Sequence, residues 1–253
     1  METLSELLAL ANIYEKELPA PVPVSLPVGA AIAGWIDHTL LKPDATASQI
    51  KQLCQEARQH SFAAVCVNPV YVHLASGLVG NSKVAVCTVV GFPLGATLPS
   101  CKVVETLECL HGGASEIDMV IHIGALKGQA YGQVLNDISS VVQVAHNHGA
   151  IVKVIIEAAL LTRFEKIVAC LLSQHARADF VKTSTGFAAT GATTDDVELM
   201  RRVVGSKMGV KAAGGIRTLD DSVAMIRAGA TRIGASAGVQ IVQQAQAGQA
   251  AAR

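Results

Sequence analysis

The sequence has no surplus of charge of either sign, because 20 Lys and Arg residues balance 20 Asp and Glu residues. Proteins that hold DNA or RNA need positive charge to neutralise phosphates. We therefore expect no nucleic-acid partner. The six cysteines are scattered through apolar segments and form no CxxC pair. This distribution is typical of reduced thiols, without disulfides or structural zinc.

Signals for export and for membrane insertion are also missing. The first ten residues contain Glu2 and Glu6 and lack the basic cluster that begins a signal peptide. An uncharged stretch from residue 84 to residue 101 is long enough to span a bilayer, but two glycines and two prolines interrupt it. Such residues break a membrane-spanning helix. We expect a cytoplasmic protein that makes no membrane contact.

What the sequence does contain is a series of short, β-branched apolar runs that alternate with longer segments of helical period, as in βα units. Eight runs occur, and they cover residues 35–41, 63–69, 83–93, 116–123, 151–158, 179–185, 209–215 and 232–236. The length of 253 residues, 51% of them hydrophobic, suits one α/β barrel. We predict a closed (β/α)8 TIM barrel. The alternative, an open doubly wound sheet, is weakened because no GxGxxG or GxxxxGK[ST] loop follows a run.

The N-terminal segment differs in composition from the rest. Leucines recur at helical spacing between residues 3 and 18, and four of the eight prolines follow within PAPVPVSLPVG. We predict a short helical extension with a stiff, proline-rich tether over residues 1–30. A single TIM-barrel catalytic domain is then expected over residues 31–253.

Several predicted helices carry signals at their ends. Thr46 with Gln49, and Thr162 with Glu165, fit the capping box, in which each side chain bonds a backbone N–H group. Glycines that tolerate the left-handed conformation mark predicted helix ends at Gly112, Gly149, Gly205 and Gly229.

Three lysines interrupt predicted strands that should be buried on both faces. Lys153, Lys182 and Lys211 stand at equal intervals in VKV, VKT and VKA, so neighbouring strands carry them at matching places. If all three point inward, their like charges and their burial each lower the ammonium pKa, and a neutral amine can attack a carbonyl to form an imine. The alternative for any single lysine is a solvated position at the end of its strand.

Acidic and thiol side chains share these strands. Asp118 alternates with Ile117 and Met119 and is expected to point into the barrel, as a structural ion-pair partner or as a proton shuttle. Asp37 has the same ambiguity, and Thr39 lies on the same side of its strand. Cys66 is either a pocket-lining residue or a small core hydrophobe.

Glycine-rich segments follow the last two predicted strands, and they include Gly214, Gly215, Gly234 and Ser236. Bare backbone N–H groups and a nearby helix N-terminus favour an anion at this end of a TIM barrel. We therefore expect a phosphorylated ligand, whereas the alternative is that these glycines only permit tight turns.

His38 and His122 belong to no HxH or HxxxH pattern. We expect no metal and no cofactor.

Six segments in the same order resemble the deoxyribose-phosphate aldolase family. They are IDHTLLKP (36–43), AAVCVNP (63–69), CTVVGFPLGA (87–96), EIDMVI (116–121), KTSTGF (182–187) and VKAAGGIR (210–217). The resemblance extends from about residue 35 to residue 239. It implies a metal-free class I aldolase that reversibly cleaves 2-deoxy-D-ribose 5-phosphate to acetaldehyde and D-glyceraldehyde 3-phosphate.

The resemblance also implies a role for each matching residue. Lys182 would form the Schiff base, Lys211 would lower its pKa, and Asp118 would move protons through a bound water. Lys153 would support Asp118 and the substrate. The residues that would line the sugar pocket are Asp37, Thr39 and Cys66. Those that would bind the phosphate are Gly186, Gly214, Gly215, Gly234 and Ser236.

Three departures from the family pattern bear on these roles. Phe187 and Ala237 stand where some members have Lys and Ser, and the segment QQAQAGQAAAR lacks the tyrosine that helps proton transfer in certain members.

Two other functions stay open: a transaldolase-like sugar-phosphate enzyme, and a catalytically silent barrel that binds sugar phosphates. A homo-oligomer such as a dimer is compatible with apolar helix faces, but one chain shows no symmetric patch that predicts it.

Overall fold

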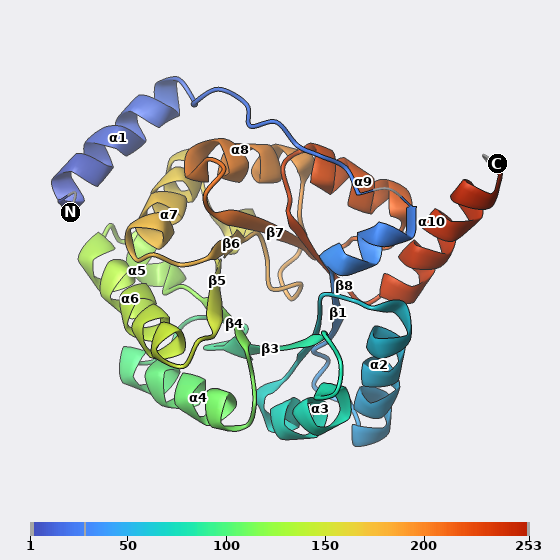
Figure 1. Cartoon of the computed structure of the whole chain (residues 1–253). Coiled ribbons are helices and arrows are strands. Elements are labelled where there is room, and N and C mark those ends of the chain that lie inside the picture. Colours follow the sequence, from blue (N-terminus) through green and yellow to red (C-terminus); the bar gives the residue numbers. More distant parts are fainter. Residues whose placement is uncertain (1–2, 28, 252–253) are drawn as a thin grey trace.

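The computed structural model describes residues 3–27 and 29–251, and they form a closed barrel of eight parallel strands surrounded by helices (Figure 1). Each strand pairs with its neighbours in chain order, and β8 returns to pair with β1. The predicted (β/α)8 TIM barrel is therefore confirmed, and the open sheet is excluded.

The strands are short, and each is followed by at least one helical segment. The strands are β1 (Ile36–Leu40), β2 (Ala64–Val67), β3 (Ala85–Val90), β4 (Glu116–Val120), β5 (Ile151–Ile155), β6 (Phe180–Lys182), β7 (Gly209–Ala213) and β8 (Arg232–Ala235). The α-helices are α1 (Leu4–Lys16), α2 (Ala47–His60), α3 (Val72–Val79), α4 (Pro99–His111), α5 (Ile123–Lys127), α6 (Tyr131–Asn147), α7 (Arg163–His175), α8 (Thr194–Val204), α9 (Leu219–Arg227) and α10 (Gly238–Ala251). Three 3₁₀ helices are η1 (Gly29–Trp35), η2 (Pro69–Tyr71) and η3 (Ala158–Leu160).

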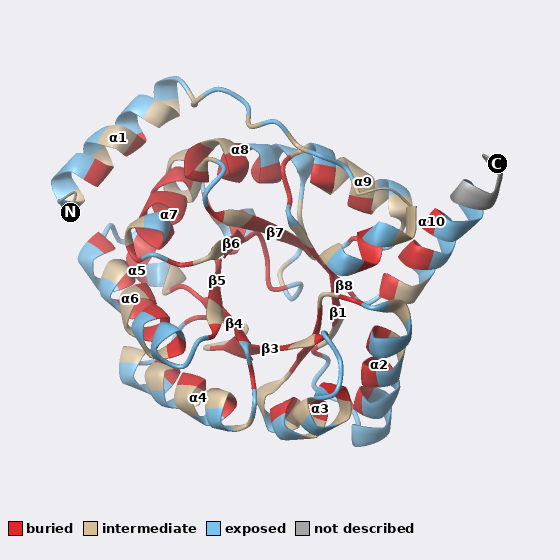
Figure 2. Cartoon of the chain, in the orientation of Figure 1, coloured by how far each residue is buried: buried red, intermediate tan, exposed pale blue. Residues whose placement is uncertain are grey.

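The strands are buried on both faces, and the helices expose only their outer sides (Figure 2). Most of the predicted apolar runs continue beyond the observed strands, because their last residues turn into loops at the carboxyl end of the barrel. His122 illustrates this: it follows β4, and its Nδ1 atom accepts a hydrogen bond of 3.0 Å from the N–H of Ala125 at the start of α5. The loops that carry these residues form the mouth where TIM barrels place their sites.

Both predicted capping boxes are present, at Thr46 for α2 and at Thr162 for α7. All four predicted glycines mark helix ends, and Gly149, Gly205 and Gly229 have positive φ angles. Gly112 is the C-cap of α4, as predicted, but it does not take the left-handed conformation. Its φ is −71°, and the neighbouring Gly113 takes the left-handed conformation with φ of 101°.

The N-terminal segment forms the expected helix, α1, which packs against α7 at the rim of the barrel (Figure 1). Leu7 and Ala11 are buried in this contact region. Arg202 on α8 fixes the tether, because its guanidinium donates hydrogen bonds to the carbonyls of Leu18 and Pro19. The domain boundary near residue 30 stays a prediction. Residues 1, 2, 28, 252 and 253, which the two predicted domains include, lie outside the described residues.

Within residues 3–27 and 29–251, no helix has both the length and the apolar character needed to cross a membrane.

We expect Thr162→Ala to lower the free energy of unfolding by about 1 kcal/mol, because it removes an N-cap bond from an exposed position. The Thr162 hydroxyl accepts from the Glu165 N–H at 3.3 Å. Urea unfolding followed by circular dichroism measures the change. Thr162→Ser should restore the stability, and Thr190→Ala, at an exposed loop position, is the control. Equal effects of Thr162→Ala and Thr190→Ala would contradict the capping role.

Candidate active site

A cavity of about 350 Å³ opens at the carboxyl end of the strands. It is formed mainly by the loops that follow β1, β6, β7 and β8. Lys182, at the end of β6, is the lysine of the predicted trio that lines it. The other lining residues are Thr39, Leu40, Leu41, Lys42, Thr185, Gly186, Phe187, Ala213, Gly214, Gly215, Ile216, Arg217, Gly234, Ala235 and Ser236.

A cluster of charged side chains is buried inside the barrel, centred on Asp118 of β4. The Nζ atoms of Lys182 and Lys211 each lie 2.7 Å from Oδ2 of Asp118, and Nζ of Lys153 lies 2.9 Å from Oδ1. Each of these four side chains is at most 3% exposed. All three lysines therefore point inward, and a single carboxylate joins them.

Two further carboxylates and one guanidinium complete this cluster. Asp37 contacts Lys211 and lies 2.6 Å from Nη1 of Arg232. Glu116 lies 2.6 Å from Nζ of Lys153 and 3.1 Å from the same Arg232 atom. Sequence reasoning missed Glu116 and Arg232. The available signal was alternation, because Glu116 shares a strand face with Asp118, and Arg232 shares one with Gly234.

The electrostatics of the cluster differ from the expectation of mutual repulsion between lysines. Burial alone lowers the pKa of Lys211, but Asp118 and Asp37 more than offset it and raise that pKa well above its usual value. The pKa of Lys153 is likewise raised, because Asp118 and other acidic partners outweigh its burial. The predicted depression is therefore wrong for both residues. Carboxylates stand between the ammonium groups and turn repulsion into attraction.

The carboxylates show the complementary effect. Burial raises the pKa of Asp118, but the charges of Lys153, Lys182 and Lys211 outweigh it and hold this pKa well below the usual range. The pKa of Asp37 is lowered in the same way by Lys211, Lys153 and Arg232 against its burial. Both groups are therefore ionised throughout the neutral range.

The strand register places the lysines at two depths. Lys182 and Lys211 are direct partners across β6 and β7, as equal spacing predicts. Lys153 pairs instead with Phe180, two residues before Lys182, so the expectation of matching places is wrong for Lys153. It sits one layer deeper in the barrel, beside Glu116 and away from the cavity.

The predicted site residues divide between these two regions. Seven line the cavity: Thr39, Lys182, Gly186, Gly214, Gly215, Gly234 and Ser236. The remaining five, Asp37, Cys66, Asp118, Lys153 and Lys211, are buried beneath it. Asp37 and Cys66 thus lie under the cavity and are not part of its wall, in contrast to Thr39. Gly234 also makes room for the cluster, because a Cβ atom there would lie 3.1 Å from Cε of Lys211.

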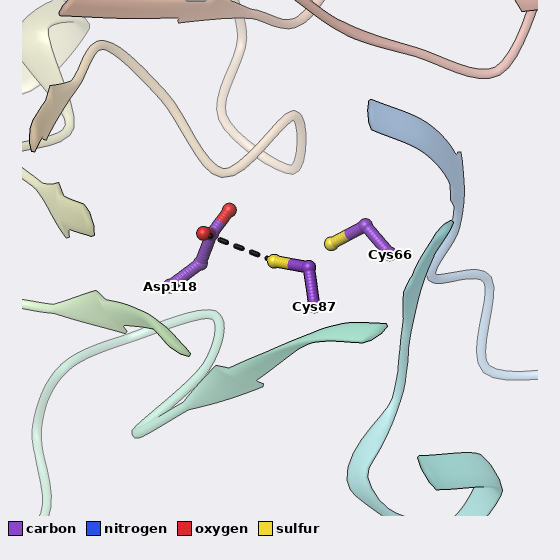
Figure 3. A group of neighbouring side chains, drawn as sticks. All are labelled: Cys66, Cys87 and Asp118. Atoms are coloured by element: carbon purple, nitrogen blue, oxygen red, sulfur yellow. Dashed lines mark hydrogen bonds between the residues drawn. The ribbon is translucent and has the colours of Figure 1, made fainter. Parts of the chain in front are cut away.

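Two thiols adjoin the central carboxylate (Figure 3). Cys66 and Cys87 are partners on β2 and β3, and Sγ of Cys87 lies 3.1 Å from Oδ1 of Asp118. Their sulfur atoms and an Asp118 oxygen all lie within 4.8 Å of one another, a donor set that could hold a metal ion. Asp118 is already engaged by three ammonium groups, which a metal ion would have to displace. The metal-free site stays a prediction.

These features define a class: a TIM barrel with a buried lysine amine at the floor of a glycine-walled cavity. A family model described as DeoC/LacD family aldolase matches residues 32–244. The chain therefore belongs to the DeoC/LacD aldolase family.

Curated relatives and solved structures agree with this assignment. A deoxyribose-phosphate aldolase of Halalkalibacterium halodurans is 59% identical over 213 residues, which make up 84% of this chain and 95% of the relative. One from Thermococcus gammatolerans is 58% identical over 221 residues, or 87% and 98% of the two chains. The crystal structure of a putative deoxyribose-phosphate aldolase from Coccidioides immitis has a TM-score of 0.90 at 43% identity, covering 96% of this chain and 98% of its own.

We expect acid to destabilise the protein as the pH falls below about 4. Asp118 and Asp37 have folded pKa values below the ordinary 3.8, so the stability they contribute is present above that pH and is lost below it. Each group can contribute a slope of up to about 1.4 kcal/mol per pH unit. Urea unfolding between pH 7 and pH 3 measures this slope. Asp37→Asn removes one of these titrating groups and should reduce the slope by up to about 1.4 kcal/mol per pH unit. An unchanged slope would contradict the assignment.

Proposed function

We propose that the protein is a class I aldolase that reversibly cleaves 2-deoxy-D-ribose 5-phosphate to D-glyceraldehyde 3-phosphate and acetaldehyde through a Schiff base on Lys182. One observation carries the proposal. Among the described lysines of the buried cluster, Lys182 alone both lines the cavity and contacts a single carboxylate.

This asymmetry selects the amine that reacts. Lys211 contacts Asp37 and Asp118, and Lys153 contacts Asp118 and Glu116. Four cations face three carboxylates in the cluster, so the loss of one proton leaves it neutral. The loss costs least at Lys182, which has the fewest acidic partners and opens to the cavity.

The neutral amine of Lys182 attacks C1 of the open-chain sugar, and loss of water gives an iminium ion. Acetaldehyde carries two carbons, so the bond that breaks is the one between C2 and C3. As the 3-hydroxyl loses its proton, the electrons of that bond move toward the iminium nitrogen. D-Glyceraldehyde 3-phosphate leaves, and the enamine that remains is protonated and hydrolysed to acetaldehyde.

Asp118 is the proposed acid and base group, acting through a water molecule, because its Oδ2 atom contacts both Lys182 and Lys211. Lys211 is proposed to stay cationic through the cycle, because Asp37 and Asp118 both contact its ammonium group. A proton can pass between the reacting centre and the cluster without a new buried charge. This pair and water are proposed to carry the protonation of the enamine.

The phosphate is proposed to bind at the glycine-rich wall. Gly186, Gly214 and Gly215 have positive φ angles, which glycine adopts readily. Phe187 adds no charge and instead packs edge-on against Phe92, with ring centroids 5.3 Å apart. Exposed Lys42 and Arg217 also line the cavity and supply positive charge for the anion. Gly234 and Ser236 lie just before α10, whose N-terminus favours an anion.

The two alternative functions predict different products. A transaldolase-like enzyme would transfer a larger fragment and release no acetaldehyde, and a silent barrel would give no turnover. A coupled assay for acetaldehyde separates the aldolase from both alternatives, and an assay for consumption of the sugar phosphate in the presence of an acceptor aldehyde separates those two. The homodimer and the cytoplasmic location stay predictions. A solved relative from Aeropyrum pernix, with a TM-score of 0.81 and 34% identity over 96% of this chain and 97% of its own, is described as a unique tetramer.

We expect sodium borohydride with 2-deoxyribose 5-phosphate to inactivate the protein and to leave a reduced adduct on Lys182. Hydride reduces the imine to a stable amine, which peptide mass spectrometry locates. Lys182→Ala should give no adduct and no acetaldehyde. An adduct on another lysine would refute the assignment.

We expect Lys211→Leu to abolish turnover at neutral pH and to recover part of it as the pH rises. The substitution removes a positive charge beside Lys182, whose ammonium is then harder to deprotonate. A pH–rate profile of acetaldehyde release between pH 6 and pH 10 tests this. A flat, inactive profile would mean that Lys211 does more than adjust charge.

A further inference from the structure

Glu157 has an unusual backbone conformation beside the loop that follows β6. It lies two residues after the end of β5 and has φ of 52° and ψ of 63°, in the left-handed region. A residue with a long side chain pays for this conformation, at a cost of about 1 kcal/mol or more. Strain of this kind persists where surrounding contacts fix it, and it is concentrated at functional sites. The side chain is 3% exposed.

The carboxylate of Glu157 fixes the loop after β6. Its Oε2 atom accepts a hydrogen bond of 2.5 Å from the hydroxyl of Thr185 and one of 3.2 Å from the N–H of Thr185. The Thr185 hydroxyl oxygen in turn accepts from the N–H of Phe187 at 3.1 Å. The backbones are also joined, because Ala158 donates to the carbonyl of Thr183 at 2.9 Å.

Between these fixed points lies Gly186, with φ of 86°. It lines the cavity, and in the described part of the chain its N–H group has no hydrogen-bond acceptor. The Glu157 bonds therefore hold the residues on both sides of an unpaired donor that belongs to a cavity-lining residue. The other carboxylate oxygen, Oε1, is buried without a hydrogen-bond partner among the described residues, which carries an energetic cost.

We infer that Glu157 is a positioning residue that aims the Gly186 N–H at the phosphate of the substrate. This inference rests on the proposed phosphate-bearing substrate. Glu157 itself does not line the cavity, and its negative charge would repel an anion, so its effect passes through Thr185. Lys182 lies on the preceding strand and is held by Asp118, independently of this loop. Loss of Glu157 should consequently weaken phosphate binding more than it slows the chemical steps.

The backbone conformation provides a sharp test. Glu157→Gly removes the carboxylate while keeping a residue that adopts positive φ without strain. We expect it to raise KM for 2-deoxyribose 5-phosphate by about 10- to 100-fold, as for loss of a hydrogen bond to a charged group. The kcat value should change less than about threefold, and kcat/KM for unphosphorylated 2-deoxyribose should be unchanged. Glu157→Gln keeps an acceptor for Thr185 and should recover most of the loss.

Two further variants act as controls. Thr185→Val removes the hydroxyl with little change of shape and should reproduce the phosphate-specific loss, even if Glu157→Gly fails to fold. Gln129→Gly, at another left-handed and exposed position away from the cavity, should leave both substrates unaffected. Equal losses for the phosphorylated and unphosphorylated substrates would show a merely structural role. No loss for either would also overturn the inference.

Titration calorimetry with inorganic phosphate separates this inference from the proposed function. If the wild-type protein binds phosphate but releases no acetaldehyde, the aldolase proposal fails, and weaker phosphate binding by Thr185→Val still supports the positioning role. If cleavage occurs and phosphate affinity is the same in wild type, Glu157→Gly and Thr185→Val, the aldolase proposal stands and the positioning role is wrong.

Discussion

The contact between Asp118 and three lysines is the constraint on which the rest of the structure depends. A charge inside a dry barrel is unfavourable unless opposite charges and hydrogen bonds surround it. Each of four consecutive strands, β4 to β7, supplies one member of this contact. A slip of one residue in any of these strands would turn its charged side chain out of the barrel and leave its partners buried and unpaired. The cluster therefore fixes the register as well as the chemistry.

The same constraint explains how one lysine among three becomes the reactive one. Lys153 is shared between Asp118 and Glu116, and Lys211 is shared between Asp118 and Asp37, so both are stabilised as cations despite their burial. Lys182 stands at the boundary between the cluster and the cavity. Carboxylates thus hold two lysines charged, and position and partner number single out the third. Asp118 orients the reacting amine, because its carboxylate accepts a hydrogen bond from Nζ of Lys182.

Much of this arrangement can be predicted from the sequence, because it depends on local patterns. Period-two alternation places Asp118 and the lysines inside, and eight apolar runs predict the barrel. Which carboxylates stand between the lysines cannot be found in this way. Asp37 reaches Lys211 although 174 positions separate them in the chain, and β8 must close on β1 to bring Arg232 to Asp37. Closure is a property of the whole sheet, so the expected repulsion between lysines left out the attraction between Asp37 and Lys211.

Loop conformation is the other feature that local patterns leave undecided. The choice between Gly112 and Gly113 as the left-handed residue depends on how the turn after α4 meets α3, where Gly113 lies against Ser76. Glu157 gives no sequence signal at all, because glutamate rarely takes a positive φ. Its conformation follows from the bonds to Thr185 on the next loop. The interior of the barrel is thus specified by alternation within strands. The loops at the mouth of the barrel are specified by contacts with one another. Substitutions in these loops can therefore occur independently of substitutions in the strands.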